Sequence, residues 1–186
     1  MKNNILPAIK MTVLTLLLFA VVYPMAIWAI AQASPNQGKG EIVMHNGQKQ
    51  YSNVGQKFTD AKYFNSRPSA VDYNAAGSGA SNKGASNEEY LAEVQTRVDS
   101  FLIKNPSVKV SEIPVDLITA SGSGLDPNIS VQGAKVQAER ISKVRNIEKS
   151  AVDKLIENQI EKPLLGLFGP EKINVLKLNI ALDNLK

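Results

Sequence analysis

Two serines in a glycine-rich turn come nearest, by type and spacing, to catalytic chemistry in this chain. The turn reads SGSG at residues 121–124 and lies between Asp116 and Asp126. A hydrolase nucleophile elbow needs Gly-x-Ser-x-Gly and a histidine base, and the turn meets neither condition. A serine activated by a lysine stays open, so a membrane-tethered or secreted hydrolase using Ser121 or Ser123 is the alternative hypothesis. A structural turn or binding loop is the simpler interpretation, because glycine and serine are ordinary turn formers.

The two flanking aspartates also have a simpler explanation than paired catalytic carboxylates. Asp126 precedes Pro127 and is placed to cap a helix, as is Ser130 a few residues later. Asp116 can accept hydrogen bonds from loop amides, which requires no unusual pKa. Both aspartates are kept as candidates for contact with a ligand or partner.

Nucleotide hydrolysis and metal binding have little support in the sequence. A phosphate-binding P-loop needs Gly-x-x-x-x-Gly-Lys-Ser/Thr, and the nearest segment, GSGASNKGAS, lacks the Gly-Lys pair. There is no cysteine, and the single histidine, His45, stands beside Asn46-Gly47 in a predicted turn. We expect that the chain does not hydrolyse ATP by itself and that His45 is a solvated residue at the end of a strand.

A predicted helix after the SGSG turn carries four basic residues off its apolar face, namely Lys135, Arg140, Lys143 and Arg145. Such a cluster either holds an anionic ligand or partner or is a solvated helix surface, and both interpretations stay open. The net charge of +4 includes two lysines that precede an apolar N-terminal segment. It is therefore weak evidence for a nucleic-acid partner, and none is expected.

The segment from Tyr63 to Asn87 is rich in Gly, Ser, Asn and Ala and has no helical or strand periodicity. Loops of this length are commonly functional or disordered. This one contains aromatic side chains and an arginine, so it has more capacity to bind than a Gly/Ser linker. The candidate contact residues in it are Tyr63, Phe64, Arg67, Ser69, Tyr73, Asn74 and Asn82.

A run of 21 residues without charge, Met11 to Ala31, predicts a membrane-spanning helix. At 1.5 Å per residue it is about 31 Å long, close to the thickness of the hydrocarbon core. Pro24 should bend the helix or weaken one turn, which membrane helices tolerate where a neighbouring helix compensates. A cleaved signal peptide is the competing interpretation, although its apolar region is usually shorter. Lys2 and Lys10 lie on the short flank, which predicts a cytoplasmic N-terminus and an extracytoplasmic C-terminal domain.

The rest of the chain predicts a mixed α and β domain. The expected organisation is a cytoplasmic segment at 1–10, a transmembrane helix at 11–32, a linker at 33–40 and an extracytoplasmic domain at 41–186. Asn46-Gly47 between strand-like flanks predicts a β-hairpin. A capping box from Ser86 to Glu89 predicts a helix that ends at Asn105-Pro106, with apolar Leu91, Val94, Val98, Phe101 and Leu102.

The later elements follow from periodicity. Residues 113–130 read as a short strand that breaks into a turn, and a helix follows with Val131, Ala134, Ala138, Ile141 and Val144 on one face. A third helix should start at Ser150, and the stretch from Pro163 to Pro170 interrupts the chain. The closing INVLKLNIAL alternates apolar and polar residues, which predicts a half-buried strand.

Several of these blocks, in this order, resemble the KdpC family, a subunit of the bacterial ATP-driven potassium transporter. The resemblance rests on Tyr23-Pro24, Val54–Gln56, Tyr63–Asn74, Ser78–Asn87, Pro114–Ser130, the basic helix with Arg140 and Arg145, and Ile173–Asp183. The chain departs from the family pattern at Asn128, where a histidine is common, and at 137–140, where a Val-Pro-Arg stretch is common. Any role in the family that needs an imidazole at this position is therefore not assigned to Asn128.

The resemblance implies a non-catalytic accessory subunit of the bacterial inner (plasma) membrane, in contact with lipid, a channel-like subunit and an ATP-hydrolysing subunit. Such a subunit would assemble and stabilise the complex. The family is also described as a catalytic chaperone that raises the ATP affinity of the hydrolytic subunit, and ATP as a ligand is implied by the resemblance alone. The predicted topology favours a cap outside the membrane, because ATP is cytoplasmic and any effect on it would have to pass through the membrane helices.

Overall fold

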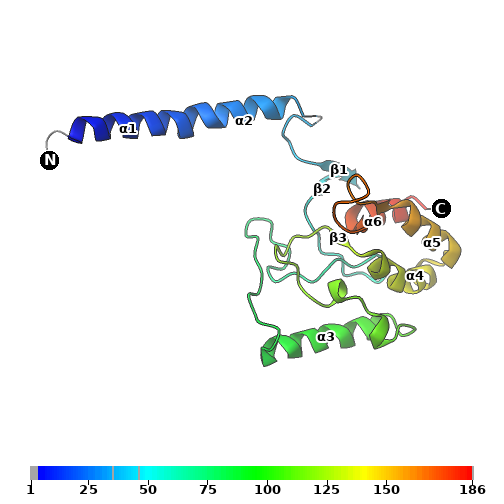
Figure 1. Ribbon diagram of the computed structural model, residues 1–186. Coiled ribbons are helices and arrows are strands. Elements are labelled where there is room, and N and C mark those ends of the chain that lie inside the picture. The colour runs from blue at the N-terminus through cyan, green and yellow to red at the C-terminus, as the bar shows by residue number, and fades with distance from the viewer. Residues whose placement is uncertain (1–3, 35, 46, 186) are drawn as a thin grey trace. The chain divides into compact units, whose positions relative to one another are not determined.

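The structure is a computed structural model that describes residues 4–34, 36–45 and 47–185. The chain divides into two compact units, Met1–Ile42 and Val43–Lys186. The first unit contains one continuous helix, Ile5–Gln32, which is long and apolar enough to cross a membrane (Figure 1). It starts six residues before the predicted Met11. None of its residues is buried within the structure, so its apolar surface is available to lipid or to another helix.

The helix is interrupted by one π-helical segment next to Pro24. It consists of α1 (Ile5–Leu17), the π segment η2 (Leu18–Val22) and α2 (Tyr23–Gln32). The amide of Tyr23 donates to the carbonyl of Leu18, five residues back. Proline has no amide to donate and its ring crowds the preceding turn, so a wider turn just before it accommodates the residue. The predicted weakening of one turn at Pro24 is therefore confirmed and takes the form of a π turn.

A two-stranded sheet begins the polar domain. Its strands are β1 (Ile42–His45) and β2 (Gln48–Tyr51), which pair with each other, so the predicted hairpin is confirmed. Gly47 has φ +76°, a left-handed conformation that glycine adopts at little cost. Asn46, the other predicted turn residue, lies outside the described residues.

The remaining helices and strands build the core of the domain. They are α3 (Glu88–Lys104), the 3-10 turns η3 (Val110–Glu112) and η4 (Val115–Leu117), β3 (Asn128–Ile129), α4 (Val131–Arg145), α5 (Lys149–Asn158), β4 (Ile160–Glu161), β5 (Lys172–Asn174) and α6 (Val175–Asp183). The three short strands form an antiparallel sheet in the order β3-β5-β4. α4 packs on α5, and α5 packs on α6. α3 lies along another side of the domain (Figure 1).

The buried core is formed mainly by the three C-terminal helices and the central strand. Its fully buried members include Ala134, Ala138, Ile141, Val152, Ile156, Ile173, Leu178 and Leu182. The predicted inward positions of α4 are thus largely confirmed, while Val144 is exposed. In α3 only Val98 of the predicted apolar face is fully buried, and Leu91 is half exposed. α3 is therefore the least covered of the domain's long helices.

The closing segment is a helix, and the predicted strand there is wrong. Only Lys172–Asn174 is extended, and the chain then enters α6. The side chain of Asn174 accepts a hydrogen bond from the amide of Lys177, which caps the helix. Val175, Leu178 and Leu182 are buried with helical spacing. The alternation of leucines matched a period of two only because this helix is buried on more than one side.

Three smaller predictions are also corrected. Asn87, rather than Ser86, caps α3, and its side chain accepts from the amide of Tyr90. The short strand expected after Ile113 is the 3-10 turn η4. α5 starts at Lys149, one residue before the expected Ser150.

Candidate partner-docking surface

The two loops singled out in the sequence, residues 63–87 and 114–130, are bonded to each other where residues 67–69 and 78–79 meet residues 121–126. The amide of Gly79 and the hydroxyl of Ser78 donate to the carbonyl of Ser123, at 2.9 and 3.0 Å. The amide of Ser121 donates to the carbonyl of Pro68 at 3.3 Å, and the Ser69 hydroxyl donates to the carbonyl of Gly124 at 2.7 Å. Backbone groups that a solvated loop would leave to water are thus paired between the loops. The two loops form one ordered surface, which we call the joined loops.

An ion pair fastens the joined loops at one end. Arg67 Nη1 lies 2.9 Å from Asp126 Oδ2, and both side chains are about a quarter exposed. Asp126 also accepts from the amide of Asn128, two residues on. It therefore orders its own turn. The expectation that Asp126 caps a helix is wrong. Ser130 is the cap of α4, and its hydroxyl accepts from the amide of Gly133.

Asp116 orders the start of α4 in the way expected of a loop-bonding carboxylate. Its two oxygens accept from the amide of Ser130 at 2.7 Å and from the Ser130 hydroxyl at 3.0 Å. The interpretation that it bonds loop amides is confirmed. A hollow of about 470 Å³ lies between Asp116, Asp126 and Arg67, with Asn128 and Ser130 also lining it. No local sequence pattern indicates this hollow, because its walls come from segments far apart in the chain.

Two glycines allow the close approach of the loop backbones. A Cβ at Gly55 would lie 2.6 Å from the carbonyl oxygen of Asp126, and the Gly55 amide donates to the carbonyl of Leu125. Gly124 has φ +68°, and a Cβ there would lie 2.8 Å from the carbonyl oxygen of Gly79. Any larger residue at these two positions would push the segments apart. This explains why glycine stands in the Val-Gly-Gln segment and in the SGSG turn.

Within loop 63–87 the aromatic residue Tyr73 is structural. Its hydroxyl donates to the carbonyl of Arg67, and its amide donates to the Ser69 hydroxyl. Burial, helped by the charge of Asp72, raises the pKa of Tyr73 to about 12. Asn74 accepts from the amide of Ala76 with its own side chain and is exposed. Asn82, at φ +54°, is also exposed.

The start of the same loop is held by side chains of the core. Asn179 exchanges two hydrogen bonds with the backbone of Phe64, at 2.9 and 3.0 Å. The amide of Asn65 donates to Gln137 Oε1 at 2.8 Å. The ring of Phe64 is completely buried. Phe64 was expected as a contact residue, but its side chain packs in the core and is not presented to a partner.

Arg140 is the second residue whose surroundings differ from the expectation. It is 7% exposed, and its guanidinium donates to Asn105 Oδ1, Gln137 Oε1, and the carbonyls of Tyr63 and Ala61. Burial lowers the pKa of Arg140 to about 10, and the charge of Asp60 opposes this shift. The residue therefore stays cationic at neutral pH, but its donors are bonded to two backbone carbonyls and two side chains of this chain. The predicted basic helix surface does not include it.

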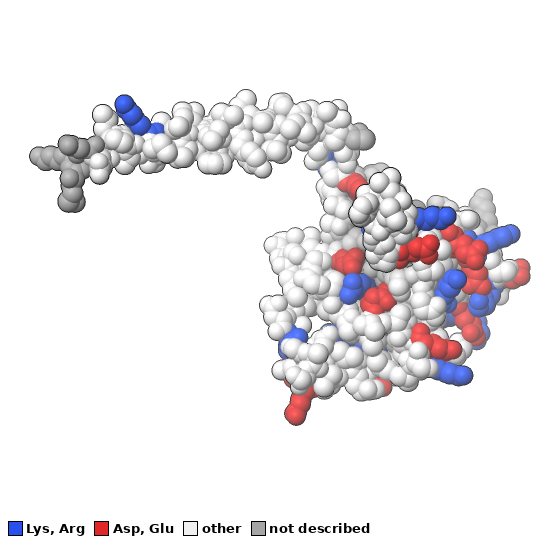
Figure 2. Space-filling view, in the orientation of Figure 1, with Lys and Arg blue, Asp and Glu red and all other residues white. Residues whose placement is uncertain are grey.

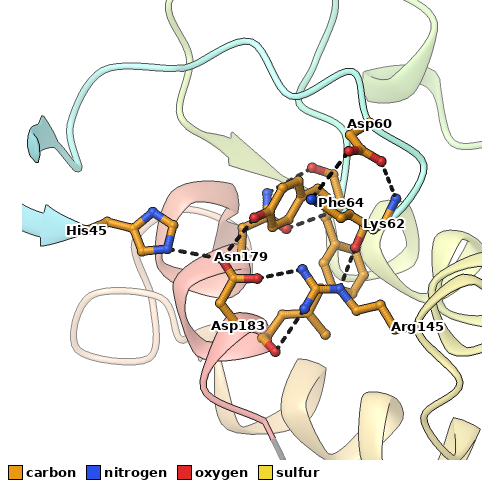
Figure 3. A network of polar contacts seen from close by, with 9 residues as sticks. His45, Asp60, Lys62, Phe64, Arg145, Asn179 and Asp183 are labelled. Atoms are coloured by element: carbon orange, nitrogen blue, oxygen red, sulfur yellow. Dashed lines mark hydrogen bonds and ion pairs between the residues drawn. The ribbon is translucent and has the colours of Figure 1, made fainter. Parts of the chain in front are cut away.

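Arg145 belongs to a separate network around Asp183 at the end of α6 (Figure 3). Arg145 Nη2 lies 2.6 Å from Asp183 Oδ1, and its Nε donates to the carbonyl of Lys62 at 2.8 Å. His45 Nε2 and the Tyr63 hydroxyl each lie 3.0 Å from Asp183 Oδ2. Partial burial opposes ionisation of Asp183, but the hydrogen bonds from Arg145 and Tyr63 outweigh it and lower its pKa. Burial, and then the hydrogen bond to Asp183, raise the pKa of Tyr63.

The expectation that His45 is simply solvated is therefore wrong, since its side chain is 14% exposed and contacts Asp183. The remaining basic residues of α4 do not form a cluster either. Lys143 pairs with Glu139 at 2.6 Å, and Figure 2 shows basic and acidic side chains intermingled on the visible face of the domain. Of the two open interpretations, the solvated and paired surface fits this arrangement better than a site for an anion.

The serines show no arrangement for acyl transfer. Ser121 is 4% exposed, and the Ser123 hydroxyl accepts from the amide of Leu125 within its own turn. The hydrolase hypothesis therefore gains no support. Over residues 4–34, 36–45 and 47–185, no group of three or more His, Asp or Glu side chains is arranged to hold a metal ion.

Comparison with known proteins gives a consistent result over nearly the whole chain. Residues 5–184 match the family model KdpC, described as "K+-transporting ATPase, c chain". A potassium-transporting ATPase KdpC subunit of Flavobacterium johnsoniae is 55% identical over 185 residues, covering 99% of this chain and 100% of the relative. The subunit of the same name from Bacteroides fragilis strain YCH46 is 47% identical, with 99% and 98% covered. That of Caldanaerobacter subterraneus is 45% identical, with 98% and 95% covered.

Proposed function

Because this chain belongs to the KdpC family, the c chains of K+-transporting ATPases, we propose that it docks on a channel-like partner subunit through the joined loops. The family assignment makes the chain a membrane-bound accessory subunit and not the catalytic one. To this we add the surface that contacts the partner subunit, which is the joined loops, and the side of the membrane on which the domain lies. In this proposal, the N-terminus is cytoplasmic, and the domain stands outside and stabilises the assembled complex.

The observation that carries the proposal is the bonding between the two loops. Long polar loops usually lose conformational entropy when they bind, which weakens association. In this chain the loops lose that conformational entropy when the domain folds, because loop 63–87 is fixed to loop 114–130 by the bonds at Ser69, Gly79 and Ser121. Exposed asparagines, Asn74 and Asn82, remain on this ordered surface. A preorganised polar surface of this kind suits recognition of a protein partner.

The membrane helix supplies the second contact in this proposal. Its side chains are exposed throughout the described residues of the first unit, and a π turn precedes Pro24. Widened turns in a membrane helix leave backbone groups that neighbouring helices help to satisfy. Packing on membrane helices of a partner subunit would do so.

The proposal also covers the family's role as a catalytic chaperone. We infer that any rise in ATP affinity of the hydrolytic subunit is transmitted indirectly, through contacts between subunits. Arg140 and Arg145, the arginines best placed in sequence to hold a phosphate, are both committed to groups of this chain. Calorimetry of the full chain with ATP tests this, and direct binding would contradict it.

Two cysteine variants test sidedness and docking together, because the natural chain has no cysteine. Ala80→Cys lies on the joined loops, and Ile103→Cys lies near the end of α3 as a control with an exposed side chain. In intact cells that express this chain without its partner subunits, both should react with a membrane-impermeant maleimide added from outside. A bulky polymer attached at position 80 should prevent assembly with the partner subunits, while the same polymer at 103 should not. Equal assembly of both conjugates would contradict the docking proposal.

A further inference from the structure

The loop between β4 and β5 presents an uninterrupted apolar tip. Residues 164–168 read LLGLF and contain no polar side chain. Leu164 and Phe168 are 70% and 64% exposed, and Leu165 and Leu167 are 80% and 81% exposed. These four residues, which we call the apolar tip, lie close together because Leu164 and Phe168 form a β-bridge. A soluble domain rarely exposes adjacent large apolar side chains without a partner.

The backbone of the apolar tip is hydrogen-bonded within the loop. The amides of Leu164 and Phe168 each donate to the carbonyl of the other residue, at 3.1 and 3.0 Å. The amide of Gly166 donates to Pro163, and that of Leu167 donates to Leu164. Entry into a hydrocarbon phase is costly mainly for backbone groups that lose water without gaining a partner. The amides of Leu164, Gly166, Leu167 and Phe168 and the carbonyls of Leu164 and Phe168 are already paired, which lowers this cost before the apolar tip meets any partner.

Beyond Pro163 and Gly169-Pro170, charged residues close the loop at its base. β4 pairs with β5, the register places Glu161 opposite Lys172, and Lys172 Nζ lies 3.8 Å from Glu161 Oε2. Lys162 is exposed on one side of the base, and Glu171 and Lys172 are exposed on the other. Long lysine side chains extend toward phosphate groups while their methylene carbons stay on apolar surface. An apolar tip above a base with lysines matches the change from acyl chain to headgroup in a bilayer.

The length of the tether keeps this loop near a membrane. The spanning helix ends at Gln32 and the domain unit starts at Val43. Ten intervening residues reach at most about 35 Å when fully extended. The domain is therefore confined near the bilayer surface on whichever side it stands, so insertion requires no additional diffusion through solution.

We infer that the apolar tip inserts into the interfacial region of the bilayer, as a second attachment of this subunit to lipid. A protein partner is the less favoured occupant, because the four residues of the apolar tip offer no side-chain hydrogen bond by which a protein would recognise them. A bilayer requires only apolar area and a satisfied backbone. The inference concerns lipid contact and does not depend on which subunit the joined loops bind.

The test uses the assembled transporter in lipid nanodiscs, with a fluorophore at Leu165→Cys or, as a matched control of equal exposure, at Ile103→Cys. Lipids with spin labels high on the acyl chain should quench the fluorophore at 165 at least about threefold more than that at 103. Replacing Leu164 and Leu167 by Asp should abolish the difference, because burying two carboxylates is unfavourable. Retained assembly of this variant would show that the subunit is still folded.

Two results would overturn the inference. Equal quenching at 165 and 103 would show that the apolar tip has no particular contact with lipid. A fluorophore at 165 that is shielded from water-soluble quenchers but not quenched by spin-labelled lipid would show that a protein subunit covers the loop. Failure of the docking proposal is read separately, from assembly of the conjugate at position 80.

Discussion

The two ends of loop 63–87 are ordered by different kinds of interaction. At its start, Phe64 is buried and the backbone is held by Asn179, Gln137 and Arg140. Toward its end, residues 74–87 are largely exposed, and their bonds to the SGSG turn come from the Gly79 amide and the Ser78 hydroxyl. A motif that reads as one block in sequence therefore has a structural half and an accessible half. Substitutions in the first half should lower stability, and those in the second should affect assembly.

The largest effect is expected from Phe64→Ala. Removing a completely buried ring leaves a cavity in the core and should lower the free energy of unfolding by about 3–5 kcal/mol. Chemical denaturation of the full chain in detergent, followed by circular dichroism, measures the change. Phe168→Ala removes an equal ring that is 64% exposed and serves as the control. Similar losses in both variants would contradict the placement of the Phe64 ring in the core.

Arg140→Ala should follow, with a loss of about 3 kcal/mol. The variant leaves Asn105 Oδ1, Gln137 Oε1 and two loop carbonyls without their charged donor in a buried position. Lys143→Ala, on the exposed side of the same helix, should change stability by less than about 0.5 kcal/mol. If the two variants unfolded at the same denaturant concentration, the hydrogen bonds of Arg140 would not stabilise the domain as proposed.

Asn87→Ala tests the accessible end, where the loop enters α3. Loss of the cap on the amide of Tyr90 should cost about 1 kcal/mol. Ser86→Ala should cost almost nothing, although sequence reasoning had placed the cap there. Thermal unfolding of the pair decides between the two positions, and a greater loss in Ser86→Ala would restore the capping box.

The smallest effect concerns acid and the network of Figure 3. The folded protein lowers the pKa of Asp183, so the stabilisation is present above the ordinary aspartate pKa of about 3.9 and is lost as the pH falls through the lower folded value. Because the site is partly solvated, the loss should stay below about 1 kcal/mol. Unfolding measured between pH 5 and 2.5 should depend less on pH in Asp183→Asn than in the natural chain.

Sequence reasoning succeeded where the signal was local. Pro106 indicated the end of α3, Asn46-Gly47 indicated the hairpin, and a charge-free run indicated the spanning helix. Each of these three features is determined by residues that are neighbours in the sequence. It failed where the deciding partner is distant. Arg140 read as part of a basic surface because its acceptors are 77 and 35 positions away in Tyr63 and Asn105.

The closing helix shows the same limit in another form. INVLKLNIAL fits a period of two, and only the cap at Asn174 and burial on several sides of α6 distinguish the helix. The joined loops were predicted separately as candidates, but their mutual bonding was not, since no local pattern records which carbonyl a Gly79 amide will reach. The apolar tip was predicted only as an interruption of the chain.

The π turn before Pro24 also sets the rotational phase of the membrane helix. Taking up one extra residue in a turn rotates everything that follows by about 100° relative to an unbroken α-helix. Side chains seven residues apart on opposite sides of Leu18–Val22 therefore no longer share a stripe. A neighbouring helix that follows one face of α1 meets a different face of α2. The two halves of the membrane helix can therefore pack against two separate neighbouring helices.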